Sequence, residues 1–568
     1  MEGPQSSTSV FMLLLVLPLG PAWHVAAQRC PQTCVCDNSR RHVTCRHQNL
    51  TEVPNTIPEL TQRLDLQGNM LKVIPPAAFR NLPYLTHLDL QHCQVELVAE
   101  GAFRGLGRLL LLNLASNRLS MLPQEALDGL GSLRRLELEG NMLEELRPGT
   151  FGALGSLTTL NLANNALVYL PSMAFQGLLR TRWLQLSHNA LSVLAPEALV
   201  GLPALRRLSL HHNELQALPG AALSQARSLT RLELGHNPLT YAGPNDTQLL
   251  DLRRNHFPSV PRAAFTGLCH LVSLHLQHCG IAELEPGALT GLDHLVYLYL
   301  SDNQLSGLSA AALQGAPHLA YLYLEHNRFL RVPGAALRAL PSLFSLHLQD
   351  NAVDRLAPGD LAGARALRCL YLSGNHISQV SAGALGPARE LEKLHLDRNQ
   401  LREVPTGALE GLPALTELQL SGNPFRALQD GAFQPVGRSL QQLFLNSSGL
   451  EQISPMAFSG LETGLRNLYL QKNQLQFLPA LLRLSGLELI DLSGNPFHCD
   501  CHLLPLHRWL TGLNLRVGAT CATPPSVRGQ KVKAAATVFE ACPGWTARKA
   551  KRTSTSRFSA RRSLNRRH

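Results

Sequence analysis

Cysteine is the residue type whose clustering points most directly to chemistry in this chain. Twelve cysteines occur in 568 residues, and eight of them gather near the two ends. The clusters are Cys30, Cys34, Cys36 and Cys45, and then Cys499, Cys501, Cys521 and Cys542. Such groups form disulfides in an oxidising compartment or bind zinc. Neither cluster pairs one C-x-x-C with a second C-x-x-C or with H-x-x-x-H, so we expect disulfides and no metal ion.

Tyrosine and histidine form a second group, in the middle of the chain. They recur every 24 residues and have two further tyrosines beside them: His275, Tyr299, Tyr323, His347, Tyr371 and His395, with Tyr297 and Tyr321. Such side chains combine apolar area with a hydrogen-bonding tip and often anchor interfaces. They also serve packing between neighbouring strands. Both interpretations stay open, and we take these eight residues as candidates for a binding surface.

The third group is a basic C-terminal tail. From Arg548 to His568 there are nine Lys or Arg and no acid, so the rest of the chain contributes only +2 to the net charge of +11. The candidate glycan-binding residues are Arg548, Lys549, Lys551, Arg552, Arg561, Arg562, Arg566 and Arg567. This composition is typical of disorder and of binding to polyanions such as heparan or chondroitin sulfate. A solvated tail without a specific partner is the alternative, and a secreted protein rarely meets nucleic acid.

Catalytic signatures are missing from the sequence. There is no nucleophile elbow, no glycine-rich phosphate loop and no H-E-x-x-H motif. The 23 histidines are scattered over the repeats and make no group with metal-site spacing. We therefore expect no enzyme activity, no cofactor and no metal.

A repeat of 24 residues explains how these side chains are positioned. Leu133, Leu136, Leu138, Asn141 and Leu143 define the pattern L-x-x-L-x-L-x-x-N-x-L, which occurs nineteen times. The L-x-L segment predicts a short strand with leucines on one face and the x residues on the other. Asn can satisfy buried backbone groups at the turn that follows. Stacked repeats then give an α/β-type solenoid, a curved horseshoe with a parallel sheet on its concave face.

The x residue between the two strand leucines changes character along the chain. In the first half it is polar or acidic, as in Asp65, Asp89 and Asn113, and in the second half it becomes Tyr or His. Since these residues point away from the core, the binding surface should lie on the concave face of the second half.

The N-terminal segment predicts secretion. The apolar run 11–19 is followed by Val25, Ala26 and Ala27, so we expect a signal peptide at 1–27. A membrane anchor is the alternative, but this run is short for a span, and no later apolar run reaches about 18 residues. Three sequons, at Asn49, Asn245 and Asn446, fit glycosylation in the secretory pathway.

The capped repeat array with a basic tail resembles the chondroadherin family of extracellular matrix leucine-rich repeat proteins. The resemblance runs from Cys30 to the tail. It implies the cap pairings Cys30–Cys36, Cys34–Cys45, Cys499–Cys521 and Cys501–Cys542. It further implies residence in cartilage matrix, collagen binding, an influence on fibril assembly and heparan-sulfate affinity of the tail.

The expected organisation has seven parts. They are a signal peptide at 1–27, an N-terminal cap at 28–58, a first array at 59–242, an irregular junction at 243–258, a second array at 259–495, a C-terminal cap at 496–543 and a disordered tail at 544–568. Between Asn237 and Asn255 the step is 18 residues instead of 24. This step is interpreted as the fusion of two arrays in a shortened product, with a natural irregular repeat as the alternative.

Four cysteines lie within the arrays. Cys93 and Cys279 replace the repeat asparagine, where packing is the expected reason. Cys269 and Cys369 lie about four strands apart, which is too far for a disulfide between them, so free thiols or intermolecular links remain open.

The leading function is a secreted matrix protein that binds collagen and modulates fibril assembly and cell–matrix contact. The alternative is a soluble ligand or decoy for a cell-surface receptor, because the same scaffold serves signalling.

Overall fold

The computed structural model describes residues 30–217, 219–239, 248–266, 268–479, 484–512, 517–543 and 545. The expected signal peptide, the sequon at Asn245 and the basic tail lie outside these residues. The chain divides into two compact units, Met1–Leu205 and Arg206–His568. The expected junction at 243–258 therefore falls within the second unit.

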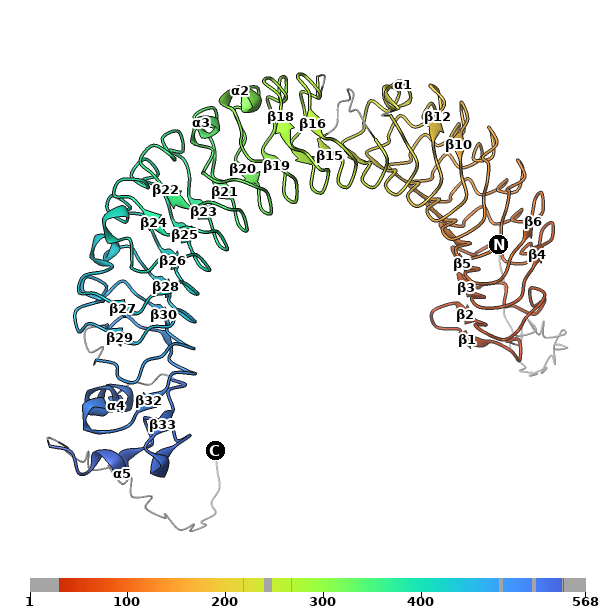
Figure 1. Ribbon diagram of the computed structural model, residues 1–568. Helices are drawn as coiled ribbons and strands as arrows, with labels where there is room; N and C mark the ends of the chain where they lie inside the picture. Colours follow the sequence, from red (N-terminus) through yellow and green to blue (C-terminus); the bar gives the residue numbers. More distant parts are fainter. Residues whose placement is uncertain are drawn as a thin grey trace, which may run out of the picture. The chain divides into compact units, whose positions relative to one another are not determined.

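The first unit is a stack of short strands on the inner side of its curve (Figure 1). β1 and β2 pair antiparallel, and from β2 onward the strands are parallel with the same residue of each repeat side by side, as in Leu64, Leu88 and Leu112. The strands are β1 (Val35–Asp37), β2 (His42–Thr44), β3 (Arg63–Asp65), β5 (His87–Asp89), β7 (Leu111–Asn113), β8 (Arg135–Glu137), β9 (Thr159–Asn161) and β11 (Trp183–Gln185).

The second unit repeats this arrangement over more turns. Its strands are β13 (Arg207–Ser209), β14 (Arg231–Glu233), β15 (Leu249–Asp251), β17 (Ser273–His275), β19 (Tyr297–Tyr299), β20 (Tyr321–Tyr323), β21 (Ser345–His347), β23 (Cys369–Tyr371), β25 (Lys393–His395), β26 (Glu417–Gln419), β28 (Gln442–Phe444), β30 (Asn467–Tyr469) and β31 (Leu489–Asp491). The central residue of each strand is Leu, or Ile490 in β31, and is buried.

The outer side of each unit is formed by short segments that return the chain to the next strand. They include five two-stranded parallel pairs: β4 (Val73–Ile74) with β6 (Leu97–Val98), β10 (Tyr169–Leu170) with β12 (Val193–Leu194), β16 (Ser259–Val260) with β18 (Glu283–Leu284), β22 (Arg355–Leu356) with β24 (Gln379–Val380), and β27 (Ala427–Leu428) with β29 (Gln452–Ile453). The helical turns are α1 (Gly220–Leu223), α2 (Ala310–Leu313), α3 (Gly334–Leu337), η1 (Thr406–Ala408) and η2 (Gln434–Val436).

Leucine fills the space between the inner strands and the outer segments. Leu298 and Leu300 have no exposed surface, and phenylalanines from successive turns pack beside one another, with 6.0 Å between the ring centroids of Phe79 and Phe103. Truncating one such leucine to alanine costs about 2–5 kcal/mol because a cavity remains. The same leucines fix which strand residues face outward.

The repeat asparagines satisfy buried backbone groups, as the sequence predicts. The amide of Asn399 donates to the carbonyls of Leu372 and Leu396 at 2.9 and 3.0 Å, and its side-chain oxygen accepts from the N–H of Ile377 at 3.0 Å. Each asparagine thus joins its own turn to the preceding one. Since these backbone groups are buried, the bonds satisfy donors and acceptors that water cannot reach.

The cysteine clusters close the two ends of the repeat array. The structure contains the four pairings implied by the family resemblance: Cys30–Cys36, Cys34–Cys45, Cys499–Cys521 and Cys501–Cys542. These thiols are therefore not zinc ligands. The C-terminal cap contains β32 (Phe497–His498), η3 (Cys501–Leu503), α4 (Leu504–Gly512), β33 (Cys521–Thr523), η4 (Pro525–Val527) and α5 (Ala536–Phe539). In α4, Leu506 and Trp509 are buried.

The shortened repeat keeps the strand register. β14 pairs with β15 through Leu232 and Leu250, as any two consecutive repeats would. The amide of Asn255 donates to the carbonyl of Leu234 at 3.1 Å, and the N–H of Leu239 donates back to Asn255 at 3.2 Å. The described strands on either side of the shortened repeat therefore keep their pairing.

No helix among the described residues is both long enough and apolar enough to span a membrane.

Candidate binding surface

The repeat geometry places the candidate tyrosines on one face of the second unit. In β19, Tyr297 and Tyr299 flank the buried Leu298, so both side chains point away from the core. The same holds for Tyr321 and Tyr323 in β20, and these residues pair with Tyr297 and Tyr299. Four tyrosines therefore form a patch on two adjacent strands.

Six of the eight candidate residues make one continuous stack, which we call the aromatic rail. It consists of His275, Tyr299, Tyr323, His347, Tyr371 and His395, one from each of six consecutive strands. The first five rings are nearly parallel, with centroids 4.2–4.4 Å apart, and His395 meets Tyr371 edge-on at 4.7 Å. Since each inner ring has neighbours on both faces, the ring faces are covered and the ring edges remain for contact with a ligand.

The other two candidates form a shorter row beside the rail. Tyr297 and Tyr321 stack at 4.7 Å, Phe344 lies 5.6 Å from Tyr321, and the guanidinium of Arg368 lies 5.6 Å above Phe344. The structure thus brings all eight predicted residues together. It also supports the packing interpretation in part, because stacking holds the rings in place.

Two histidines of the rail are oriented by serines on their own strands. The hydroxyl of Ser273 lies 3.0 Å from Nε2 of His275, and that of Ser345 lies 2.9 Å from Nε2 of His347. Ser345 is 3% exposed, so its hydroxyl serves to position the imidazole and is not presented to a ligand.

Burial keeps the middle of the rail uncharged. Desolvation raises the pKa of Tyr299 and of Tyr323, and it raises the pKa of Tyr371 to about 12. Desolvation, with a smaller effect of His395, lowers the pKa of His347 to about 4. At neutral pH these groups are therefore neutral hydrogen-bonding groups.

Charge gathers at the C-terminal end of the rail. Glu417 accepts from Lys393 at 3.0 Å and lies 2.9 Å from the ring nitrogen of His395. Although burial acts to raise it, the pKa of Glu417 is lowered overall by hydrogen bonds to Lys393 and His395 and by their charges.

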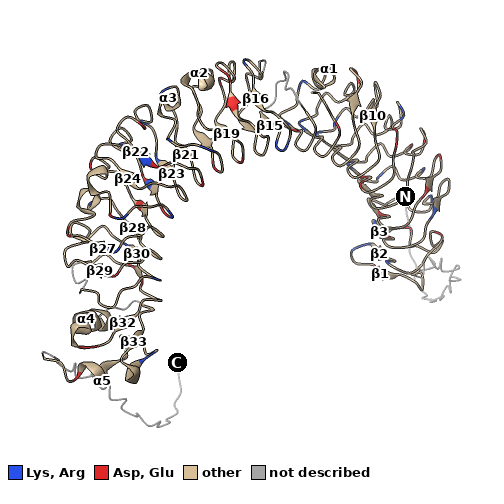
Figure 2. Ribbon diagram, viewed as in Figure 1, with Lys and Arg blue, Asp and Glu red and all other residues tan. Residues whose placement is uncertain are grey.

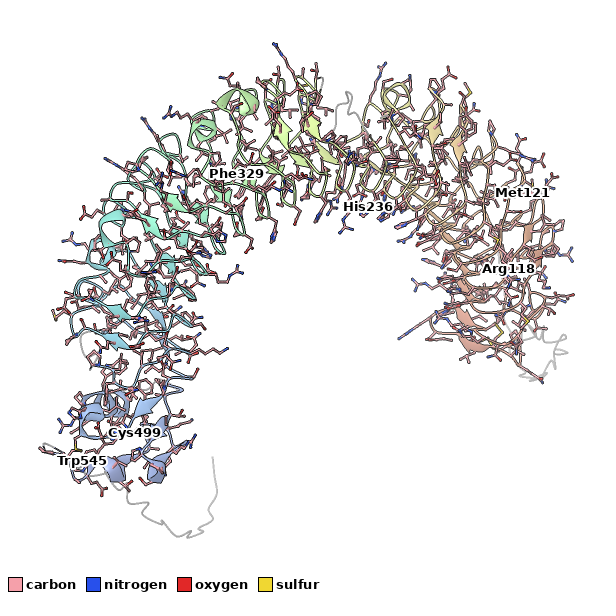
Figure 3. The ribbon with its side chains drawn as sticks, in the orientation of Figure 1. Arg118, Met121, His236, Phe329, Cys499 and Trp545 are labelled. Carbon is pink, nitrogen blue, oxygen red and sulfur yellow. A yellow bond between two sulfur atoms is a disulfide. The ribbon has the colours of Figure 1, made fainter. Side chains whose placement is uncertain are left out.

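A polar hollow of about 970 Å³ adjoins the N-terminal end of the rail. It contains four arginines and five histidines and ends at Tyr299 and Tyr323; the basic and histidine residues are Arg207, Arg231, Arg253, Arg254, His211, His212, His236, His278 and His326. Figure 3 labels His236 on the inner side of the second unit. The sequence interpretation missed this hollow, although the concentration of arginines around the shortened repeat was visible.

Among the described residues beyond the rail and hollow, charged residues of both signs are scattered along the ribbon without one long basic or acidic stretch (Figure 2). This agrees with the small net charge of the chain outside its tail.

The two sequons within the described residues differ in access. Asn49 is exposed, as is Thr51 of its sequon. The side chain of Asn446 is half-buried and accepts from the hydroxyl of Ser421 at 2.6 Å, and Ser448 of that sequon is buried. Glycosylation at Asn49 therefore requires less rearrangement than at Asn446.

The four remaining cysteines are not in disulfides. Cys93 and Cys279 are buried, and their thiols donate to the carbonyls of Leu66 and Leu252 at 3.0 and 3.2 Å, so each replaces one asparagine hydrogen bond as well as filling space. Cys269 is exposed, and Cys369 is half-buried beside Tyr371.

Comparison with known proteins agrees with this architecture. The profile of the family described as leucine rich repeat matches residues 94–143, 138–191, 180–239, 269–329, 317–377, 389–437 and 438–497. Among solved structures, a chain of the Toll–Spatzle complex from Drosophila aligns with a TM-score of 0.70 and 19% identity over 87% of this chain and 70% of the other, which is a likeness of fold alone.

Two curated relatives are much closer in sequence. Chondroadherin-like protein of Mus musculus is 68% identical over 99% of both chains. Chondroadherin-like protein of Homo sapiens is 89% identical over 319 residues, which span 56% of this chain and 42% of the human protein. The mouse alignment has 741 positions against 568 residues here, so at least 173 positions of the mouse protein have no counterpart in this chain. The chain belongs to the chondroadherin-like family of extracellular leucine-rich repeat proteins.

Proposed function

We propose that the second unit binds fibrillar collagen through the aromatic rail. The observation that carries this proposal is the continuous stack of six rings, from His275 to His395, at one position of six adjacent strands. A collagen triple helix leaves backbone carbonyls exposed along its length and has no internal hydrogen bonds within each chain. Tyrosine hydroxyls are suitable donors for those carbonyls.

The spacing of the rail also suits a collagen helix. Two steps between neighbouring strands measure about 9.5 Å, and one Gly-X-Y triplet measures about 9.3 Å at about 3.1 Å per residue. Every second ring of the rail can therefore contact an equivalent carbonyl in successive Gly-X-Y triplets. The neutral state of His347, Tyr323 and Tyr371 favours this uncharged backbone over a polyanion.

Replacement of three tyrosines by phenylalanine separates contact from packing. Tyr299→Phe, Tyr323→Phe and Tyr371→Phe together keep the stacked rings but remove three hydroxyls. Since each hydrogen bond contributes about 0.5–1.5 kcal/mol, we expect at least about tenfold weaker binding to immobilised fibrillar collagen, with secretion and thermal stability unchanged.

The matched control lies in the first unit. Asn113→Ser, Asn161→Ser and Gln185→Ser change the same repeat position on three strands, and we expect collagen affinity to stay within twofold. Unchanged affinity of the phenylalanine variant, or an equal loss in both variants, would contradict the proposal. Measurements at two salt concentrations separate the rail from charge-dependent binding by the tail.

Two further proposals concern the tail and the whole protein. The nine Lys and Arg between residues 548 and 568 favour binding of heparan or chondroitin sulfate. This predicts a strong salt dependence of binding, which neutral replacements of these residues abolish.

For the whole protein, collagen binding favours residence in the collagenous matrix of cartilage. The alternative is a function as a ligand or decoy for a cell-surface receptor. Retention of the secreted protein in salt-washed matrix supports the former, and free release into medium supports the latter.

A further inference from the structure

The hollow beside the rail is organised around two buried carboxylates. Glu233 has 9% of its side chain exposed, and its Oε1 accepts from Nη2 of Arg207 at 2.9 Å and from Nε of Arg231 at 2.7 Å. Asp251 has 10% of its side chain exposed and binds Arg253 through both oxygens, with Nη2 of Arg253 at 2.7 Å from Oδ2. The carboxylates thus hold three guanidinium groups in fixed positions.

The guanidinium groups remain accessible above these carboxylates. The side chains of Arg207, Arg231 and Arg253 are 39%, 46% and 52% exposed, although their carboxylate partners are buried. Arg254 is exposed in the same hollow. Four guanidinium groups therefore outnumber the two carboxylates on this side of the hollow.

One histidine at the rim, His236, is affected by these charges. The rings of His212 and His236 stack with centroids 3.7 Å apart. The pKa of His236 is lowered by burial first and then by the charges of Arg254, His211 and Arg253. Excess positive charge beside His236 would be relieved by an anion bound there.

Acceptors line the opposite side of the hollow. This side contains Asp302, Ser301 and Glu325. Asp302 lies 3.4 Å from His278, and the hydroxyl of Ser301 donates to Glu325 at 2.5 Å. A ligand for the whole hollow must therefore carry anionic groups at one end and hydroxyl donors at the other. An acidic peptide supplies the first but not the second, because its further carboxylates would meet Asp302 and Glu325.

We propose that this hollow binds a sulfated saccharide, with its sulfate groups on Arg254, Arg231 and the rim of His236 and its hydroxyls on the acceptor side. A volume of about 970 Å³ accommodates a short oligosaccharide. This site is separate from the basic tail, and it stands independently of collagen binding by the rail. The folded array then contributes its own glycan affinity next to the proposed collagen surface.

The test uses the full chain with its tail neutralised. All nine Lys and Arg between residues 548 and 568 are replaced by Ser, and binding of a heparin-derived hexasaccharide is measured by calorimetry. Saturable binding by this variant is the expected result. Loss of all binding on tail neutralisation would overturn the proposal while leaving glycan binding by the tail intact.

A matched pair of substitutions locates the site. The two variants are Arg254→Asn and Arg398→Asn, each made in the tail-neutralised chain. Each removes one positive charge at the same repeat position. Both arginines have a positive φ, +58° and +53° respectively, which Asn tolerates. We expect Arg254→Asn to weaken hexasaccharide binding about fivefold or more and Arg398→Asn less than twofold. Equal losses would mean diffuse electrostatic attraction, and binding of poly-glutamate as tight as that of the hexasaccharide would assign the hollow to acidic protein ligands; either result overturns the proposal.

Discussion

The inner faces of the two units have the same scaffold and different chemistry. In the first unit, the residues between the strand leucines are carboxylates and amides, and Asn161 donates to Glu137 on the neighbouring strand at 2.7 Å. In the second unit, the same repeat position holds the aromatic rail on six strands, from His275 to His395, with Tyr299 stacked on Tyr323 at 4.3 Å. In both units the leucines on either side are buried. The outward-facing residue is not part of this leucine core. Its type can therefore differ between the two units without a change of fold.

The largest expected effect tests whether the scaffold is equivalent in both units. Asn141 and Asn399 make the same three types of hydrogen bond to their own and the preceding turn. Replacement of either by Ala leaves buried backbone groups without partners, so we expect each to lower the local free energy of unfolding by about 3 kcal/mol. Hydrogen exchange of the flanking strands measures both values, and a difference above about 1 kcal/mol would show that the scaffolds are not equivalent.

His347 in the second unit and Asp89 in the first should respond to acid in opposite directions. The pKa of His347 is about 4 in the folded second unit and about 6.5 when unfolded, so only the unfolded chain gains this proton as pH falls from 6.5 to 4. The second unit should lose about 2 kcal/mol of stability between pH 7 and pH 5 from this residue. In the first unit, burial raises the pKa of Asp89, so protonation there favours the folded state as pH falls through the raised value.

Thermal unfolding followed at pH 7 and pH 5 checks this contrast. His347→Phe keeps an aromatic ring in the stack but removes the titrating group, so the acid-induced loss in the second unit should shrink. An identical loss in the variant and the parent chain would place the pH dependence elsewhere.

The smallest expected effect concerns the four cysteines outside the disulfides. Burial raises the pKa of Cys93 to about 11 and that of Cys279 to about 12, so almost no thiolate exists at pH 8. We expect a thiol reagent to modify exposed Cys269 first and Cys369 more slowly, with Cys93 and Cys279 protected until unfolding. Mass spectrometry of the labelled native chain gives the order, and early labelling of Cys93 or Cys279 would contradict the assigned burial.

Much of the fold was predictable because each repeat is specified locally. The spacing of Leu136, Leu138 and Asn141 predicts a strand, its buried face and the turn that follows, and the same pattern nineteen times predicts the stack. The two cysteine clusters predicted disulfide-bonded caps at the ends. The shortened step at Asn255 was visible as well, and its interpretation as a junction between two arrays stays a prediction.

Other properties depend on neighbours one repeat away, which no single repeat contains. The period placed Tyr299 and Tyr323 on adjacent strands, but only the tertiary structure decided that their rings stack face to face and expose edges. Similarly, the composition showed arginines and acids near the shortened repeat, but burial of Glu233 and Asp251 beneath exposed guanidinium groups depends on side-chain packing between turns. Sequence determined which residues face outward because strand alternation is local; tertiary contacts decided which parts of those residues a ligand can reach.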